Sequence, residues 1–247
     1  QAEHRIMVQG NNKLALVNKK GEIEWQMKWG GIHDIHVLPS GNIMVQERNR
    51  KVVEIDPRTK KVVWSYDATQ ENGNQGKRIE VHAFQPLANG HIMIAESGAG
   101  RIIEIDRQGK IHHQIKLKVN KPHPHRDTRL ARKLANGHYL VCHEGDGFVR
   151  EYEQGTGEVV WEYDVPLFGR DGKGGHGAEA FGDKCFGALR LENGNTLIGC
   201  TNGNRVIEVD GAGKIVWKVK RPKKPNYPSP TDTISFSIIT YYHHIIR

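Results

Sequence analysis

The stretch that decides the fold is GIHDIHVLPSGNIMVQERNRKVVEID at residues 31–56, which continues directly into PRTKKVVWSYD at residues 57–67. It holds four short extended runs separated by turn signals such as Pro39-Ser40-Gly41-Asn42. Apolar runs of this length, bounded by Gly, Pro and Asn, predict antiparallel strands. A degraded form of the stretch recurs along the chain, and fixed-period recurrence predicts a repeat fold.

The turn of this stretch returns three times, as LANGH at 87–91 and at 134–138 and as LENGN at 191–195. Asn-Gly between apolar runs is a strong hairpin signal because both residues tolerate positive φ. Three further extended runs follow each turn, and the last of them places Trp64, Trp161 and Trp217 in one column, with His113 in the second copy. We expect these rings to pack between neighbouring sheets.

The N-terminal residues fit the same template without its first strand, with Trp25 in the tryptophan column. Such a pattern is typical of a β-propeller in which a C-terminal strand completes the first sheet and removes an exposed edge. The sequence therefore predicts an all-β fold, namely a single β-propeller domain over residues 1–247. The propeller has five four-stranded antiparallel blades, and the C-terminal strand closes the ring. The alternative is a fragment of a larger ring of about six to seven blades. The blades are predicted at residues 5–28 plus 233–242, 33–67, 82–117, 128–165 and 186–220.

Composition excludes several classes of function. The net charge is +8, but Lys and Arg are scattered among acidic residues, and no basic patch interleaved with aromatic residues predicts nucleic-acid binding. No apolar run approaches the length of a membrane span. Cys142, Cys185 and Cys200 lack metal-knuckle spacing, so we expect buried free thiols. We expect a monomer that is exported to the periplasm or secreted with its signal removed, and whose partner is a small anionic molecule or a saccharide.

The candidate site residues lie in the connections that precede the inner strands and at the ends of the second strands. Long loops on one face of a rigid scaffold commonly carry binding sites. Counting back eight positions from the turn glycine places His33, His82, Arg129 and Phe186 at equivalent positions. The ligand-binding candidates of the same region are His36, Glu47, Glu96, Arg126, Asp127, His143 and Glu144.

Imidazoles from successive connections could hold a divalent metal ion, since His nitrogens with a carboxylate suit Zn, Cu, Mn or Fe. The predicted metal ligands are His33, His82, His125 and His176. The same groups could instead form an anion-binding or acid/base site with Arg126 or Arg129. Each His could also simply hydrogen-bond loop backbone, and the sequence leaves these alternatives open.

Three segments carry a family resemblance: HDIHVLPSGNIMV (33–45), VVEIDPRTKKVVWSYD (52–67) and LENGNTLIGCTNGNRVIEVDGAGKIVWKV (191–219). They resemble pyrroloquinoline-quinone-like (PQQ-like) propeller repeats and are similar to arylsulfotransferase-type propellers, whose blades share a His-Asp-x-x-x-Leu-Pro-x-Gly-Asn stretch. In the sulfotransferase family, channel-facing His and Arg residues carry out sulfuryl transfer. The resemblance therefore implies His33 as a catalytic candidate by motif, followed by His82, His125 and Arg129. A PQQ cofactor is not expected, because no disulfide or aromatic stacking platform is visible.

Three hypotheses about function follow. The first is a binding module with a His-rich polar site at the central channel mouth, which holds a metal ion or a small anionic ligand. The second is an enzyme, either an arylsulfotransferase-like transferase or a polysaccharide lyase, with His33, His82, His125 and Arg129 as acid/base and anion-stabilising groups. The third is a protein-interaction scaffold without a small-molecule site.

Overall fold

A computed structural model describes residues 5–169, 185–200 and 205–220 of the chain, and these residues form strands, turns and loops without a helix. In chain order the strands are β1 Ile6–Gly10, β2 Lys13–Val17, β3 Ile23–Lys28, β4 Ile35–Val37, β5 Ile43–Glu47, β6 Lys51–Asp56, β7 Lys61–Asp67, β8 Glu80–Pro86, β9 Ile92–Ser97, β10 Arg101–Ile105, β11 Ile111–Lys116, β12 Leu130–Lys133, β13 Tyr139–His143, β14 Phe148–Tyr152, β15 Val159–Asp164, β16 Gly187–Arg190, β17 Thr196–Cys200, β18 Arg205–Val209 and β19 Ile215–Lys220.

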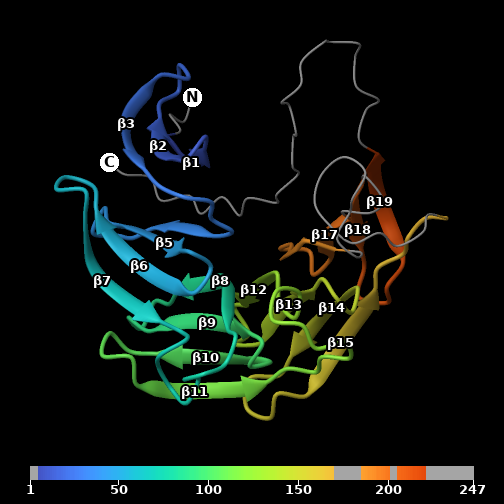
Figure 1. Cartoon of the computed structure of the whole chain (residues 1–247). Coiled ribbons are helices and arrows are strands. Elements are labelled where there is room, and N and C mark those ends of the chain that lie inside the picture. The colour runs from blue at the N-terminus through green and yellow to red at the C-terminus, as the bar shows by residue number, and fades with distance from the viewer. Residues whose placement is uncertain (1–4, 170–184, 201–204, 221–247) are drawn as a thin grey trace. The chain divides into compact units, whose positions relative to one another are not determined.

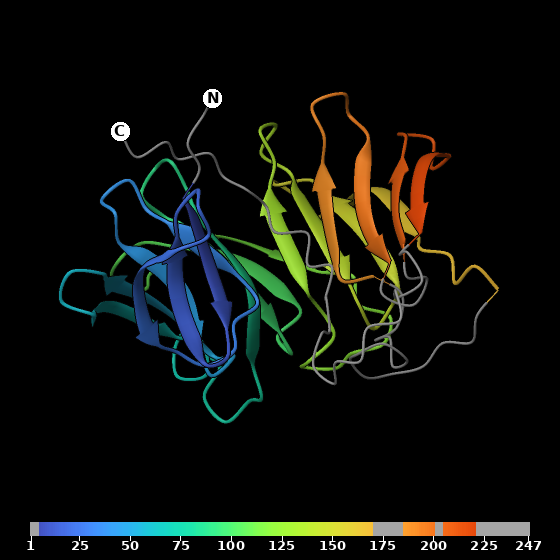
Figure 2. The ribbon, with the colours of Figure 1, turned by 90° about the horizontal axis from the view of Figure 1, so that it is seen from above.

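The strands form five sheets in which consecutive strands are neighbours (Figure 1). The first sheet holds β1 to β3, and the others hold β4 to β7, β8 to β11, β12 to β15 and β16 to β19. The strands of each sheet run side by side as an antiparallel meander (Figure 2). The predicted fold is confirmed: the chain is an all-β, five-bladed β-propeller. The strand predicted at residues 233–242 to complete the first blade lies outside the described residues.

The chain divides into two compact units. The described residues of unit 1 are 5–99 and 103–113, which include the first three blades apart from parts of β10 and β11. The described residues of unit 2 are 100–102, 114–169, 185–200 and 205–220, which include the last two blades.

The inner hairpin of four blades uses the repeated turn in a way that differs from the sequence prediction. Only the glycine takes a positive φ, as at Gly90 with φ 84°, and its N–H donates to the carbonyl of Leu87 at 3.0 Å. Asn89 instead accepts the backbone N–H of His91 through its side-chain oxygen at 3.1 Å. The asparagine therefore stabilises the turn as a side-chain cap, while the left-handed conformation falls to glycine, which has no Cβ to clash.

A tryptophan in the fourth strand ties each of three blades to the next. Its indole N–H donates to a backbone carbonyl in the turn between the third and fourth strands of the following blade. The pairs are Trp25 with Pro57 at 2.8 Å, Trp64 with Arg107 at 2.8 Å, and Trp161 with Gly211 at 3.1 Å. The prediction that these rings pack between neighbouring sheets is confirmed for these three.

A β-bulge next to the tryptophan aims the ring. In the β6–β7 pair the register shifts immediately before Trp64, and Val63 is the extra residue. The same shift in the β14–β15 and β18–β19 pairs makes Val160 and Val216 the extra residues. A bulge locally interrupts the alternation of side chains and redirects its neighbours. The extra valines are exposed, with 55% of the Val63 surface accessible.

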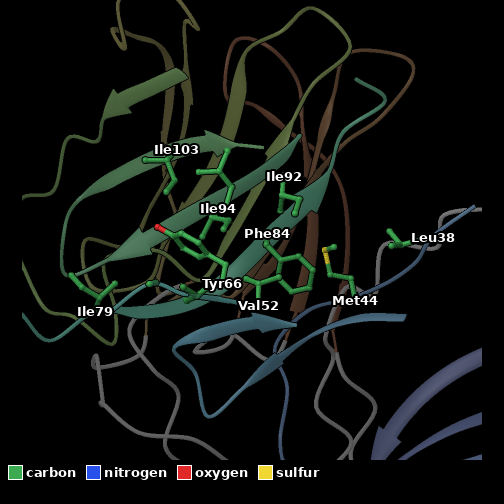
Figure 3. Close-up of a cluster of buried hydrophobic side chains, with 12 residues drawn as sticks. Leu38, Met44, Val52, Tyr66, Ile79, Phe84, Ile92, Ile94 and Ile103 are labelled. Carbon is green, nitrogen blue, oxygen red and sulfur yellow. The ribbon is translucent and has the colours of Figure 1, made fainter. Parts of the chain in front are cut away.

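Apolar side chains fill the space between consecutive sheets of a unit. Between the second and third blades, Met44 and Val52 face Phe84, Ile92 and Ile94, all fully or almost fully buried (Figure 3). Along β5, Met44 alternates with Ile43 and Val45, which belong to the cluster that packs against the first blade, so both faces of this sheet are buried.

The corresponding cluster of unit 2 joins the last two blades and contains all three cysteines. Cys142, Cys185 and Cys200 are buried free thiols, as the sequence predicted. Burial raises the pKa of Cys200 to about 12, so this thiol stays protonated and behaves as a small apolar side chain.

The indole hydrogen bond yields a test of the fold. Replacing Trp64 with Phe keeps an aromatic ring but removes the donor to the Arg107 carbonyl. We expect the free energy of unfolding to fall by about 1 kcal/mol, measured by urea denaturation. Val63→Thr on the same strand is the control, because an exposed substitution of similar shape changes stability by less than about 0.5 kcal/mol. Equal losses in the two variants would contradict a specific role of the indole.

Candidate functional site

The candidate residues of unit 1 meet where the second blade borders β8, the inner strand of the third. Gln46 is fully buried there. Its Oε1 accepts the backbone N–H groups of His33 at 3.1 Å and Asp34 at 2.9 Å. Its Nε2 donates to the backbone carbonyl of His82 at 2.9 Å. The buried side-chain amide of Gln46 therefore holds both segments that carry the predicted site residues His33 and His82.

Two more side chains of the second blade hydrogen-bond the backbone edge of β8. Asp34 Oδ2 accepts the N–H of Phe84 at 3.2 Å, and His36 Nε2 donates to the carbonyl of the same residue at 2.8 Å. Asp34 and His36 are both buried, and the unpaired groups of a strand edge require such partners. His36, predicted to bind a ligand, lies against β8 backbone.

His82 is the extra residue of a second kind of β-bulge, in the β8–β9 pair. Its imidazole is fully buried, and Nε2 lies 3.2 Å from Glu80 Oε2. His33 is exposed and packs edge-on against it, with ring centroids 4.6 Å apart. Arg78 Nη2 donates to the other oxygen of Glu80 at 2.8 Å. The structure thus brings two predicted residues together and adds Glu80, which the sequence reasoning missed; the Glu-x-His spacing of residues 80–82 was the available signal.

The two predicted carboxylates at the ends of second strands in unit 1 have different surroundings. Glu96 is buried, and it accepts the hydroxyl of Tyr66 and the side-chain amide of Asn74, each at 3.0 Å. Asn74 lies in the long connection after β7, so Glu96 anchors that connection. Glu47 is half-buried at the equivalent place in β5, with Oε2 3.8 Å from Lys51 Nζ.

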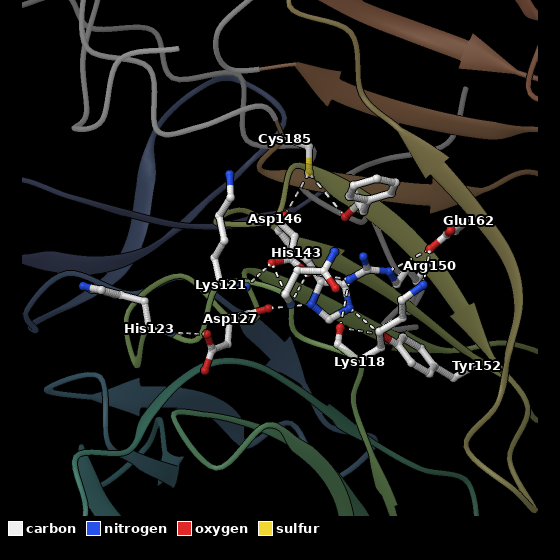
Figure 4. Close-up of polar contacts among 12 residues, drawn as sticks. Lys118, Lys121, His123, Asp127, His143, Asp146, Arg150, Tyr152, Glu162 and Cys185 are labelled. Atoms are coloured by element: carbon white, nitrogen blue, oxygen red, sulfur yellow. Dashed lines mark hydrogen bonds and ion pairs between the residues drawn. The ribbon is translucent and has the colours of Figure 1, made fainter.

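His143 is the centre of a buried polar cluster in unit 2 (Figure 4). Its Nδ1 donates to the backbone carbonyl of Asp127 at 2.7 Å, and its Nε2 accepts the hydroxyl of Tyr152 at 2.8 Å. Burial and the positive charge of Arg150 lower the pKa of His143 to about 4. The imidazole is therefore neutral near neutral pH, with both nitrogens engaged by the protein.

Asp146 pins the connection that carries His123 and His125. Its oxygens accept the backbone N–H groups of Asn120, at 2.9 and 3.0 Å, and of Lys121, at 2.8 Å (Figure 4). Arg150 donates to Asp146 at 2.6 Å. Burial opposes ionisation of this carboxyl, but these hydrogen bonds outweigh it and hold the pKa of Asp146 below its usual value.

Arg129 is buried and ion-paired with Glu144. Its Nη2 donates to His125 Nε2 at 2.9 Å, and its guanidinium lies over the ring of Phe186 at 4.7 Å. The structure therefore joins four predicted positions in unit 2, namely His125, Arg129, Glu144 and the equivalent position Phe186. The carboxylate neutralises the charge of Arg129, which weakens the case for anion stabilisation by this residue.

The remaining predicted residues of unit 2 shape a tight turn. Arg126 and Asp127 both donate their backbone N–H groups to the carbonyl of His123, and Asp127 Oδ1 accepts the N–H of His123. Arg126 also accepts the N–H of Gly145 at 2.9 Å through its carbonyl. His176, the fourth predicted metal ligand, lies outside the described residues.

The clamp made by Gln46 can be tested through stability. Gln46→Met keeps the volume but leaves two N–H groups and one carbonyl without their buried partner. We expect a loss of about 2–4 kcal/mol in the free energy of unfolding, measured by urea denaturation. Met44→Leu, a buried apolar exchange on the same strand, should cost less than about 1.5 kcal/mol. A loss for Gln46→Met no larger than that of the control would contradict the clamp.

The low pKa of His143 predicts a pH dependence of stability. The unfolded chain takes up the proton near the ordinary pKa of 6.5, whereas the folded chain resists it until about pH 4. Stability therefore falls as pH drops from 6.5 to 4, by up to roughly 3 kcal/mol. In His143→Asn, which keeps a donor for the Asp127 carbonyl, urea denaturation at several pH values should show a shallower decline. An unchanged decline would assign it to other groups, and His112→Gln should keep the full slope.

Comparison with solved structures shows the same fold in proteins of low sequence identity. A protein of unknown function from Bacteroides caccae is 20% identical with a TM-score of 0.66, and the match covers 89% of this chain and 73% of that one. Virginiamycin B lyase from Staphylococcus aureus is 16% identical with a TM-score of 0.55, covering 86% and 64%. BBS1N in complex with ARL6DN is 13% identical with a TM-score of 0.56, covering 89% and 62%. The chain thus spans less than two thirds of the last two proteins.

No curated protein sequence matches the chain. In the part of the chain that the structure describes, no helix has the length and hydropathy to cross a membrane. Residues 10–236 match the family described as outer membrane protein assembly factor BamB, whose members are PQQ-like repeat propellers associated with the periplasm. This match extends over most of the sequence and agrees with the repeats and blades described above, and the chain therefore belongs to this family.

Proposed function

We propose that this chain is a β-propeller binding module whose ligand site is the histidine pair of unit 1, His33 and His82, and that the ligand is a metal ion or a small anion. The observation that carries the proposal is the exposed imidazole of His33, which stands against the buried imidazole of His82 at 4.6 Å between ring centroids. Glu80 lies beside them and adds a carboxylate.

The site is fixed before any ligand arrives. Gln46 holds the backbone of both histidines, and Asp34 and His36 hold the backbone of Phe84 further along β8. A ligand that binds a preorganised site loses little free energy to the ordering of protein groups. The other predicted polar residues that anchor connections, such as Glu96 and His143, have their side chains engaged by those connections. The histidine pair differs from them because His33 is exposed, and this makes it the best candidate contact.

The family match supports a proposal about the compartment in which the protein acts. Members of the BamB-like family are associated with the periplasm, and this supports an exported protein that binds its ligand in that compartment.

A second candidate function, a protein-interaction scaffold, is favoured by the outer strand β19. Val216, Trp217 and Val219 on this strand are 49%, 49% and 44% exposed. Apolar side chains gathered on one outer strand are typical of surfaces that bind other proteins. The family description, an assembly factor, points in the same direction.

The histidine pair is tested by ligand-induced shifts in melting temperature. Untagged protein is heated with zinc chloride, sodium sulfate or sodium phosphate, for wild type and His33→Ala. A probe present at about 100 times its Kd stabilises by about 2.7 kcal/mol, which raises the melting temperature of a domain of this size by about 5–10 °C. We expect at least one probe to give this shift in wild type and not in His33→Ala.

The control is His91→Ala, which removes an imidazole that is stacked on His112 elsewhere in unit 1. It should keep the full shift. If none of the three probes stabilises the wild type, or if His33→Ala responds as wild type does, the binding site is not at the histidine pair.

A further inference from the structure

We infer that the ligand of this site is a divalent transition-metal ion of the zinc type, chelated by Glu80 and His82 of β8, with the exposed imidazole of His33 turning toward the ion as the third donor. This inference rests on the proposed function and deepens it, because it names the ligand and adds a residue. The set of two imidazoles and one carboxylate is a common set of ligands for zinc in sites that keep one position open.

The separation of the two donor atoms on β8 fits a shared metal. Glu80 Oε2 and His82 Nε2 are 3.2 Å apart. Two atoms that each lie about 2.0–2.1 Å from a zinc ion at a tetrahedral angle are about 3.3–3.4 Å apart. The pair can therefore chelate one ion with almost no movement of either side chain.

Two other His–carboxylate pairs of the described chain have a different geometry. His112 and Asp106 are 2.7 Å apart, and so are His138 and Glu151. A separation of 2.7 Å is that of a direct, charge-assisted hydrogen bond, in which the proton occupies the space between the two atoms. The wider spacing at Glu80 and His82 separates their pair from these two. His36 and Asp34 are spaced as widely, at 3.3 Å, but both side chains hydrogen-bond the backbone of Phe84.

The groups around the pair orient the two donors through hydrogen bonds, as the hydrogen-bond partners of metal ligands do. Arg78 donates to Glu80 Oε1 at 2.8 Å, and the other oxygen is directed at His82. His82 occupies a β-bulge, and its carbonyl is tied to Gln46. Bulges recur beside functional sites because they redirect a side chain.

The three donor side chains differ in their exposure to solvent. The His82 side chain is completely buried, the Glu80 side chain is 14% exposed, and His33 is exposed. A metal ion can therefore enter past His33 and bind against the two inner donors. The open position on the exposed side would be filled by water or by a small ligand, which agrees with the ligand class of the proposed binding module.

The test measures zinc affinity of the metal-free, untagged full chain by calorimetry, and cobalt(II) coordination by its visible d–d absorption. We expect one equivalent of zinc per chain, and a loss of affinity of at least about tenfold in Glu80→Gln and in His33→Gln. His33 is exposed, so His33→Gln is safe for folding. The matched control is His112→Gln, which removes the imidazole of the 2.7 Å pair and should bind zinc as wild type does.

Each contrary outcome is distinct. Wild-type zinc affinity in Glu80→Gln overturns the inference, and so does retention in His33→Gln, because the three-donor site then does not exist. Absence of zinc binding and of the cobalt band also overturns it. If sulfate or phosphate nevertheless stabilises the protein in a way that needs His33, the histidine pair remains a binding site and only the metal assignment fails.

Discussion

The hydrogen bond from the indole of one blade to the turn of the next is the interaction on which the rest of the structure depends. A twisted sheet can slide over its neighbour when only apolar side chains meet, whereas Trp64 bound to the Arg107 carbonyl fixes one register. The bulge at Val63 makes the bond possible, because it aims the ring out of the alternation of β7. With the blades in register, β8 lies where Asp34, His36 and Gln46 can satisfy its edge. The outer strands thereby position the candidate site at the inner one.

A second constraint is the pairing of buried polar groups. The connections between blades are long, and their backbone groups need partners wherever they are covered. Buried side chains at or near the ends of the second strands supply them: His143 binds the carbonyl of Asp127, and Asp146 binds the N–H of Lys121. Glu96 acts indirectly, because it holds the side-chain amide of Asn74, which also donates to the carbonyl of Ala68. Such residues look like ligand-binding groups in a sequence because they are polar and lie next to loops. In the structure they bind the loops themselves.

The fold could be predicted from the sequence because each repeat contains the local signals that specify one blade. Turn glycines, alternating strands and the tryptophan column are all readable within one repeat, so the five blades could be predicted. The site depends on contacts that no local pattern reveals. Gln46 donates to the carbonyl of His82, which is 36 positions away in the sequence. The β-bulge at His82 has no recognisable motif in the surrounding residues. Glu80 was missed because alignment to the turn glycine finds one position per blade, whereas the donor pair spans two positions on one strand.

Residues at equivalent positions of successive blades nevertheless make contacts that the sequence repeat alone does not reveal. Within each unit, the member from one blade contacts the member from the next: His33 packs against His82, and Arg129 lies over Phe186. The same contact thus occurs once in each unit, but it is made by side chains of different chemistry. In unit 2 the pair is a guanidinium on a phenyl ring, with its charge neutralised by Glu144, and it has no donor atoms for a metal ion. In unit 1 it is two imidazoles beside a carboxylate. Because the contact is shared and the side-chain chemistry is not, the difference supports the proposal that the ligand site lies at the unit 1 pair.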